Sequence, residues 1–479
     1  MIQLVNLILG VVAGIFEAIL DVTINGIVSL VPSARKKEYN ADFIEAGKVL
    51  RSRDTGFCIT GRRSLSIDES YKNCLCLGGS GSGKSSTVLI NSALKMADGN
   101  SSLIFNDPSG EIRMSVSGAL KKAGYKILIL KYDDDRSQCF NPLLRCKSIS
   151  DIQKLSNLLL RVSLGESYHR DAFWNRNAES LTSVIIRYLI FHCPVPLRTF
   201  HNVLALLNEF AAHPEKVDKL FVRTKDQQLI SEYSAFVSYG DKTLSGIIAV
   251  CKSALSIFSD ETVAKVTSID TIDFKQFRKE KTALFINNSV PDMHYYGVLS
   301  SLFFQQFFNE VLSKIPGKEE LSIFFLLDEA SSLYLSSLST TIANIRKSFG
   351  GILLLFQDYH QIEHLYGSYE AKNISANCFA KVYLPGQPIE TCKMLESVLG
   401  QFQYYDDEEN LRTRHLLSAD EIRILEKAII LLGNKPPILT KMYPFYEDRK
   451  LKRLTELPAC EPDNVLPFDT PPVIQFQAK

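Results

Sequence analysis

Short apolar runs alternate with amphipathic stretches in two parts of the chain, one before residue 131 and one after residue 281. A short apolar run predicts a buried strand, and apolar residues recurring every three or four positions predict a helix. Their alternation indicates a mainly parallel sheet with crossover helices. Strands are expected at 73–77, 102–106, 126–130, 282–287, 322–327, 352–356, 380–384 and 428–432, and helices between them at 84–96, 110–123, 295–312 and 338–349.

Helical periodicity replaces the strand pattern between residues 150 and 268. We therefore expect an all-α domain inserted into the α/β domain, with helices at 152–164, 177–191, 199–210 and 227–258. A hairpin is expected within residues 57–67. The expected boundaries are a linker at 33–56, an α/β domain formed by 57–149 and 276–456, an insertion at 150–275 and a disordered Pro-rich tail at 457–479.

Residues 1–32 form an apolar stretch whose only charged side chains are Glu17 and Asp21. As one hydrophobic helix it would be about 45 Å long, and the apolar core of a bilayer is roughly 30 Å thick. The helix could be embedded in a membrane, lie on its surface or dock on protein alone. The basic residues 35–37 favour a cytoplasmic location for the rest of the chain. A polar or small-residue stripe consists of Gln3, Asn6, Gly10, Gly14, Glu17, Asp21 and Asn25.

The net charge of +1 does not indicate a nucleic-acid partner, so any DNA contact must be made by local groups. The ten cysteines show no spacing that suits zinc. We expect them to be reduced and mostly buried, as in a cytoplasmic protein.

A phosphate-binding loop follows the first expected strand. The segment from Gly78 to Ser85 matches the pattern G-x₄-G-K-[ST], and an expected helix follows it, which is the context that the pattern requires. Glycines let backbone N–H groups surround phosphate oxygens; Lys84 would reach the β- and γ-phosphates of ATP, and the Ser85 hydroxyl would bind Mg²⁺. The α/β domain is thus a nucleotide-binding domain. The expected nucleotide contacts are Gly78, Gly79, Ser80, Gly81, Ser82, Gly83, Lys84, Ser85 and Ser86.

Asp328 and Glu329 follow the apolar strand expected at 322–327. A buried parallel strand delivers its last side chains to the crevice where ligands bind. We expect Asp328 to hold Mg²⁺ together with Ser85, and Glu329 to polarise the attacking water. The pairing with the phosphate-binding loop predicts ATP hydrolysis.

Two further side chains are expected to act on the γ-phosphate. Gln357 ends the next strand, where its amide could sense loss of the phosphate. Arg346, on the preceding helix, could supply positive charge to the transferring phosphoryl group. Arg412 and Arg414 are alternatives for that task. Asp107 and Pro108 are expected to start a helix as its N-cap and first residue, and Trp174 is expected to anchor the core of the insertion.

The ordered set of motifs resembles the TraG/TraD-type coupling ATPases of conjugative type IV secretion. The resemblance covers about residues 72–191 and 282–440. Ser109 stands where that family usually has lysine, and residues 1–32 offer at most one span where it commonly has two. The matching elements are the phosphate-binding loop, Asp107-Pro-Ser-Gly-Glu111, Asn141-Pro-Leu143, Phe173-Trp174, Leu327-Asp-Glu-Ala330, Arg346-Lys347, Gln357 and Leu416-Leu-Ser-Ala-Asp-Glu421.

The resemblance implies a RecA-like P-loop ATPase that is a membrane-bound homohexamer at the cytoplasmic face of the bacterial inner membrane. It also implies DNA, a relaxase and type IV secretion channel components as partners, and an Arg346 that completes a neighbouring subunit's site. Two alternatives remain: another DNA-translocating ATPase, of the chromosome-translocase or helicase type, and a nucleotide-gated adaptor without motor activity.

Overall fold

The computed structural model describes residues 40–165, 167–287 and 290–476. The helix expected at 1–32 lies outside these residues. The chain divides into two compact units, Phe43–Cys392 with Ala419–Lys479, and Met1–Asp42 with Lys393–Ser418, which we describe separately. Within the described ranges, no helix has both the length and the apolar character needed to cross a membrane.

The described part of the larger unit contains a nine-stranded sheet in the order β11-β10-β7-β1-β6-β5-β2-β4-β3. The strands from β7 to β3 in this order are parallel to one another. At the other edge, β10 runs antiparallel to β7, and β11 runs antiparallel to β10. The predicted mainly parallel sheet is therefore confirmed. Its strands are β1 Cys74–Leu77, β2 Ser101–Asn106, β3 Lys126–Leu130, β4 Thr282–Ile286, β5 Ser322–Leu327, β6 Gly350–Phe356, β7 Ala380–Tyr383, β10 Ala428–Leu432 and β11 Ile438–Thr440.

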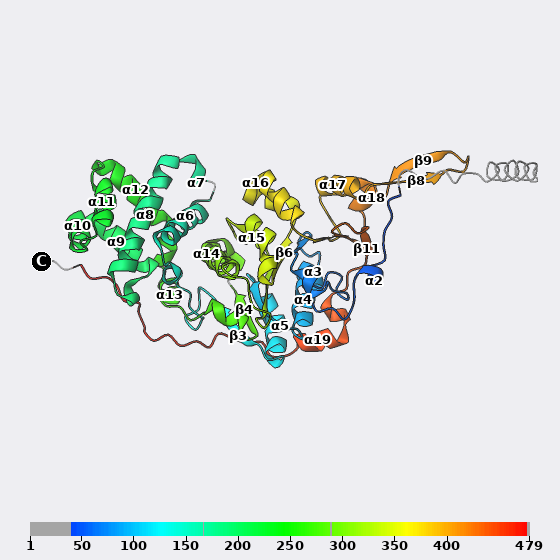
Figure 1. Ribbon diagram of the computed structural model, residues 1–479, viewed down its shortest axis with the longest axis horizontal. Helices are drawn as coiled ribbons and strands as arrows, with labels where there is room; N and C mark the ends of the chain where they lie inside the picture. The colour runs from blue at the N-terminus through cyan, green and yellow to red at the C-terminus, as the bar shows by residue number, and fades with distance from the viewer. Residues whose placement is uncertain (1–39, 166, 288–289, 477–479) are drawn as a thin grey trace, which may run out of the picture. The chain divides into compact units, whose positions relative to one another are not determined.

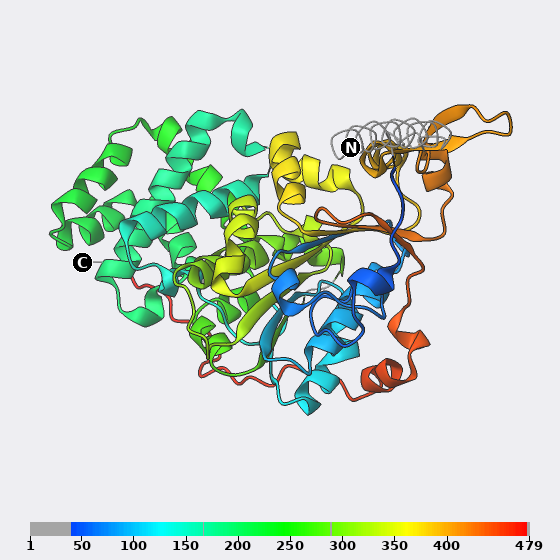
Figure 2. The ribbon, with the colours of Figure 1, turned by 45° about the vertical axis from the view of Figure 1, so that its right-hand side comes forward.

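The central strands β5 and β6 are mostly apolar, as expected for strands with helices over both faces of the sheet, which Figure 2 shows. Phe324 and Leu326 of β5 belong to the core shared with α4 (Ile90–Met96) and α5 (Glu111–Lys122). Phe325 points to the other face, where its ring lies 4.7 Å from that of Phe308 in α14 (Met293–Leu312). Alternate side chains of one strand thus fill two separate layers.

The insertion consists of helices, grouped in cyan and green in Figure 1. The single helix expected at 227–258 is wrong: two helices form, separated at residues 238–240, where Gly240 has extended backbone and becomes the N-cap of the second. Trp174 packs against Gly246 in that second helix, where a Cβ atom would lie 2.6 Å from the indole. The helices are α6 Ile149–Leu164, α7 Ser167–Arg170, α8 Ala172–His192, α9 Phe200–Ala212, α10 Pro214–Arg223, α11 Gln227–Val237, α12 Asp241–Ala254 and α13 Glu261–Val266.

The hairpin expected within residues 57–67 is only partly present. Backbone bonds join Leu65 N to Phe57 O and Ile59 N to Arg63 O, but they form isolated bridges rather than strands. The second arm ends early because Ser66 caps α3 (Ile67–Ser70) in a capping box. A short helix, α2 (Ala46–Val49), also lies in the expected linker.

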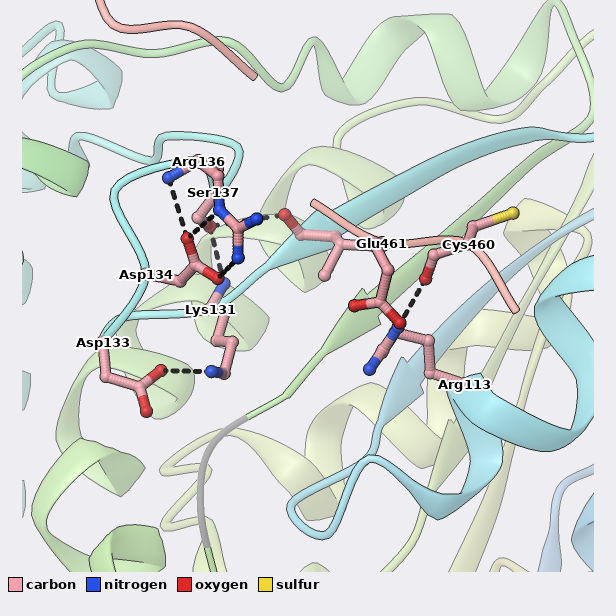
Figure 3. Close-up of polar contacts among 9 residues, drawn as sticks. Arg113, Lys131, Asp133, Asp134, Arg136, Ser137, Cys460 and Glu461 are labelled. Carbon is pink, nitrogen blue, oxygen red and sulfur yellow. Dashed lines mark hydrogen bonds and ion pairs between the residues drawn. The ribbon is translucent and has the colours of Figure 1, made fainter. Parts of the chain in front are cut away.

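The tail, residues 458–476, has no helix or strand but is bound to the rest of the unit, which differs from the expected disorder. At α5, Ser117 Oγ accepts a bond of 2.9 Å from Cys460 N, and Arg113 pairs with Glu461 at 2.9 Å (Figure 3). Farther along, Asn464 donates from its side chain to Ser137 O at 2.7 Å.

The tail then reaches the all-α insertion. The buried Asn202 of α9 donates to Pro472 O at 2.9 Å and accepts from Ile474 N at 2.8 Å. Its amide thus pairs with the tail backbone as a neighbouring strand would. Gly118 accommodates the tail on α5, because a Cβ atom there would lie 2.4 Å from Pro458 O.

The smaller unit contains a polar hairpin formed by β8 (Gln401–Tyr405) and β9 (Leu411–His415). Arg412 and Arg414 both lie on β9. Arg412 Nε donates to Asp406 Oδ2 at 2.8 Å, and Arg414 lies near the ring of Phe402. Neither strand was expected from the sequence. All ten cysteines of the chain lie in the described residues as free thiols, and all but Cys460 are buried, as predicted.

Candidate nucleotide-binding site

The phosphate-binding loop connects β1 to the helix that contains α4, and its shape requires glycine at three positions. Gly81 and Gly83 have φ angles of 74° and 86°, in the left-handed region that favours glycine. At Gly78, a Cβ atom would lie 2.5 Å from Ser82 Oγ and 2.9 Å from Leu384 Cβ. The loop is therefore folded back tightly, and a helix N-terminus follows it, as expected for anion binding.

Lys84 lies inside this loop and is 6% exposed. Its Nζ donates to Gly78 O at 2.6 Å and to Gly79 O at 3.2 Å. The helix then begins with a π-helical turn, Ser85–Leu89, before α4. The ammonium is thus held by loop carbonyls at the position where the sequence pattern predicts phosphate.

Ser85 and Asp328 meet although 243 residues separate them. Ser85 Oγ donates to Asp328 Oδ2 at 3.1 Å, and the buried Asp328 Oδ1 has no partner among the described residues. Burial, and next the charge of Glu329, raise the pKa of Asp328 to about 7, while the Ser85 bond lowers it. An unpartnered carboxylate oxygen beside a hydroxyl is a donor set that suits Mg²⁺.

Glu329 and Gln357 also meet, as the parallel order of β5 and β6 predicts. Gln357 Nε2 donates to Glu329 Oε2 at 3.5 Å. Glu329 has φ 43° and ψ 52°, a left-handed conformation that is costly for a residue with a Cβ atom. The backbone turns sharply at Glu329, between β5 and the short helix Ala330–Ser332.

Two polar residues at the end of β2 belong to the same edge. Asn106 contacts the Asp328 backbone, and this role was not predicted. Asp107 is not the N-cap: Gly110, with φ 76°, has that position, and α5 begins at Glu111. The Asp107 carboxylate still caps the helix, because it accepts from Arg113 N at 2.7 Å; burial raises its pKa to about 6. The rule that found Asp328, polar residues after a buried strand, also applies to Asn106.

Arg346 does not join these groups. The helix expected at 338–349 ends at Asn344, and Arg346 is exposed on the following 3-10 turn, Ile345–Ser348. That turn precedes β6, whereas Gln357 follows it. At about 3.3 Å per residue, β6 separates the two by roughly 20 Å. Arg346 therefore lies at the opposite edge of the sheet from the phosphate-binding loop of its own subunit.

Comparison with known proteins extends the sequence argument. The sequence model of the family described as type IV secretory system conjugative DNA transfer matches residues 33–465. VirD4 of Rhizobium radiobacter is 22% identical over 383 residues, covering 74% of this chain and 54% of the relative. The conjugal transfer protein TraG of the same organism is 24% identical, covering 62% of this chain and 47% of the relative. The chain thus spans about half the length of these curated relatives.

The fold is similar to that of the solved bacterial conjugative coupling protein TrwB lacking its N-terminal segment. The TM-score is 0.69 at 17% identity, over 90% of this chain and 97% of that one. A TrwB structure in complex with ADP and Mg²⁺ gives a TM-score of 0.68 at 18% identity, over 90% and 98% of the two chains.

The fold and the loop around Lys84 define a P-loop α/β protein of the RecA-like class. Within that class, the chain belongs to the conjugative DNA-transfer family of type IV secretory systems.

Proposed function

We propose that the chain is an ATP-hydrolysing coupling protein that brings a relaxase-bound DNA strand to a type IV secretion channel. The observation that carries this proposal is the convergence of Lys84, the Ser85–Asp328 pair and the Glu329–Gln357 pair at one edge of the sheet. The proposal extends to this chain the role of TrwB as a conjugative coupling protein and the DNA-transfer role of its family.

The site residues have separate tasks in this proposal. Lys84 leaves the loop carbonyls to neutralise phosphate charge, and the loop N–H groups hold the phosphate oxygens. Ser85 and Asp328 hold Mg²⁺, which neutralises charge developing on the phosphates. Glu329 orients a water molecule and Gln357 holds the Glu329 carboxylate in place. TrwB complexes with ADP and Mg²⁺ and with a non-hydrolysable ATP analogue support the choice of ligands.

Assembly into a homohexamer would give Arg346 a task. The residue is exposed and lies far from its own phosphate-binding loop, but a neighbouring subunit in a ring could present it to the next site. An arginine in that place stabilises the transferring phosphoryl group. We further propose DNA in the ring channel and attachment through residues 1–32 to the cytoplasmic face of the inner membrane.

A nucleotide-dependent DNA pump of another kind and a nucleotide-gated adaptor are the competing functions. All three would bind nucleotide, so binding alone does not separate them. DNA-stimulated turnover separates both motors from the adaptor. A coupling protein should transfer a relaxase-bound DNA strand faster than a free strand, and this preference separates it from other DNA pumps.

The deciding experiment measures ATP hydrolysis by the full chain without DNA, with single-stranded DNA and with double-stranded DNA. Lys84→Ala should abolish turnover, because the phosphate charge is then not neutralised. The exposed Lys450 of α19 (Arg449–Thr455) offers a matched control, and Lys450→Ala should keep turnover. Equal rates for Lys84→Ala and the parent protein would contradict the proposed site, and unstimulated turnover would favour the adaptor.

A further inference from the structure

Asn106 is a buried side chain at the end of β2 whose amide reaches the backbone of the neighbouring strand. It is 2% exposed, and its Nδ2 donates to the Asp328 carbonyl oxygen at 2.6 Å. A second, longer bond of 3.4 Å goes from Nδ2 to Ser332 Oγ. In the opposite direction, Asp328 N donates to Asn106 O at 3.1 Å. Asn106 therefore contacts both polar groups of the Asp328 backbone.

These bonds hold the peptide that joins Asp328 to Glu329. A carbonyl oxygen buried without a donor is costly, so the amide of Asn106 selects the orientation in which the oxygen faces β2. Glu329 is left-handed only in that orientation, because rotating the peptide away changes its φ angle. A strained conformation persists when its surroundings determine it, and here Asn106 is the determining group.

The consequence concerns where the Glu329 carboxylate lies. In the observed backbone it is within 3.5 Å of Gln357 Nε2, next to the strand end that also carries Asp328. A change of φ at Glu329 would move its side chain away from Gln357 while leaving the phosphate-binding loop untouched. Lys84 and Ser85 have no hydrogen bond with Asn106, and rotating the peptide after Asp328 leaves the Cβ atom of Asp328 in place, so we expect the Ser85–Asp328 contact to persist without Asn106.

We propose that Asn106 is a positioning residue for hydrolysis: by holding the Asp328 carbonyl, its amide keeps Glu329 in the left-handed conformation that directs its carboxylate to the attacking water. This inference rests on the proposed ATP hydrolysis. It assigns Asn106 no contact with the nucleotide, so its removal should reduce kcat and spare affinity.

Two substitutions separate hydrogen bonding from packing. Asn106→Leu has a similar volume and no donor, and we expect kcat to fall by about 100-fold, as for a misplacement of about 1 Å at a reacting group. The Kd for Mg²⁺·ADP should stay within about threefold of the parent value. Asn106→Asp has nearly the same shape, but its carboxylate can donate only when protonated. Its turnover relative to the parent should therefore decrease as pH rises.

The experiment measures kcat and Kd for the parent, both variants, Glu329→Gln and the double variant Asn106→Leu/Glu329→Gln, by single-turnover hydrolysis where rates are low. If Asn106 acts through Glu329, Asn106→Leu should cause little further loss once Glu329 is glutamine, since coupled residues are not additive. If Asn106 had a merely structural role, Asn106→Leu would reduce kcat by the same factor in the parent protein and in the Glu329→Gln variant. This result would overturn the inference.

Other outcomes are equally decisive. If the parent shows no Lys84-dependent hydrolysis, the proposed function fails before Asn106 is tested. If the parent hydrolyses ATP and Asn106→Leu matches it, only the positioning role fails. Should Asn106→Leu not fold, Asn106→Ala, which also lacks a donor, takes its place in the same comparison, and an equal loss of kcat with and without Glu329→Gln would overturn the role.

Discussion

Replacing Asp328 by asparagine tests the electrostatics of the site. Burial and the charge of Glu329 raise the pKa of Asp328 from 3.8 to about 7. A folded pKa above the unfolded value means that the unfolded chain binds fewer protons between these pH values, so stability falls as pH rises from about 4 to about 7. Since one pKa unit corresponds to about 1.4 kcal/mol, the raised pKa of Asp328 lowers the free energy of unfolding by at most about 4 kcal/mol at pH 8, where the folded carboxyl is ionised, and by about 2 kcal/mol at pH 5, where it is protonated in the folded chain alone.

Asparagine keeps the shape of the side chain and cannot ionise, so Asp328→Asn should stabilise the metal-free and nucleotide-free protein. The advantage should grow by about 2 kcal/mol between pH 5 and pH 8, measured by denaturant unfolding at several pH values. Asp407→Asn, at an exposed position between β8 and β9, serves as the control and should show no such trend. An Asp328→Asn variant whose advantage is independent of pH, or that is less stable than the parent at pH 8, would refute the reasoning.

Three other predictions concern the subunit contact, the tail and the N-terminus. Arg346→Ala should reduce the rate of ATP hydrolysis by about 10³-fold. If the arginine acts across subunits, mixing this variant with Lys84→Ala should restore part of the rate. A rate that does not change with the mixing ratio, once exchange of subunits is verified, would contradict this. Gly118→Ala should destabilise the full chain by about 1–3 kcal/mol, because its methyl group meets Pro458 O and the Cβ and O of Leu457. In a chain ending at residue 456, where these contacts are gone, the same substitution should raise the temperature of thermal unfolding, because alanine is the better helix former. Deleting residues 1–32 should move the protein from the membrane fraction to the supernatant in sedimentation, and parent protein found only in the supernatant would contradict membrane attachment.

The groups that were predictable from the sequence share a local signal. The phosphate-binding loop is a contiguous pattern between a strand and a helix, and Asp328 and Glu329 directly follow an apolar strand. The proximity of Gln357 follows from one further rule, that parallel neighbours end at the same edge. These predictions needed no knowledge of side-chain contacts across the chain.

The remaining features depend on contacts that leave no periodic pattern. Asn106 acts on a carbonyl 222 residues away, and nothing in its own segment names that partner. The β8–β9 hairpin is mostly polar and exposed, so it lacks the apolar run by which strands were found. The tail is held by hydrogen bonds from side chains far away in the sequence, such as Asn202, and the Pro-rich composition of the tail does not predict them. Arg346 was expected on a longer helix, which ends instead at Asn344.

The tail changes the mechanics of the inserted domain. A domain that is inserted through two chain connections can rotate about the hinge axis that passes through both of them. Here α6 of the insertion also packs on α14, and the tail adds a further attachment: Asn202 bonds to its backbone at residues 472 and 474, and Arg113 and Ser117 of α5 bind the same segment. Rotation of the insertion relative to the nucleotide-binding domain would require the tail to detach from Asn202 or from α5. The tail therefore restricts this rotation.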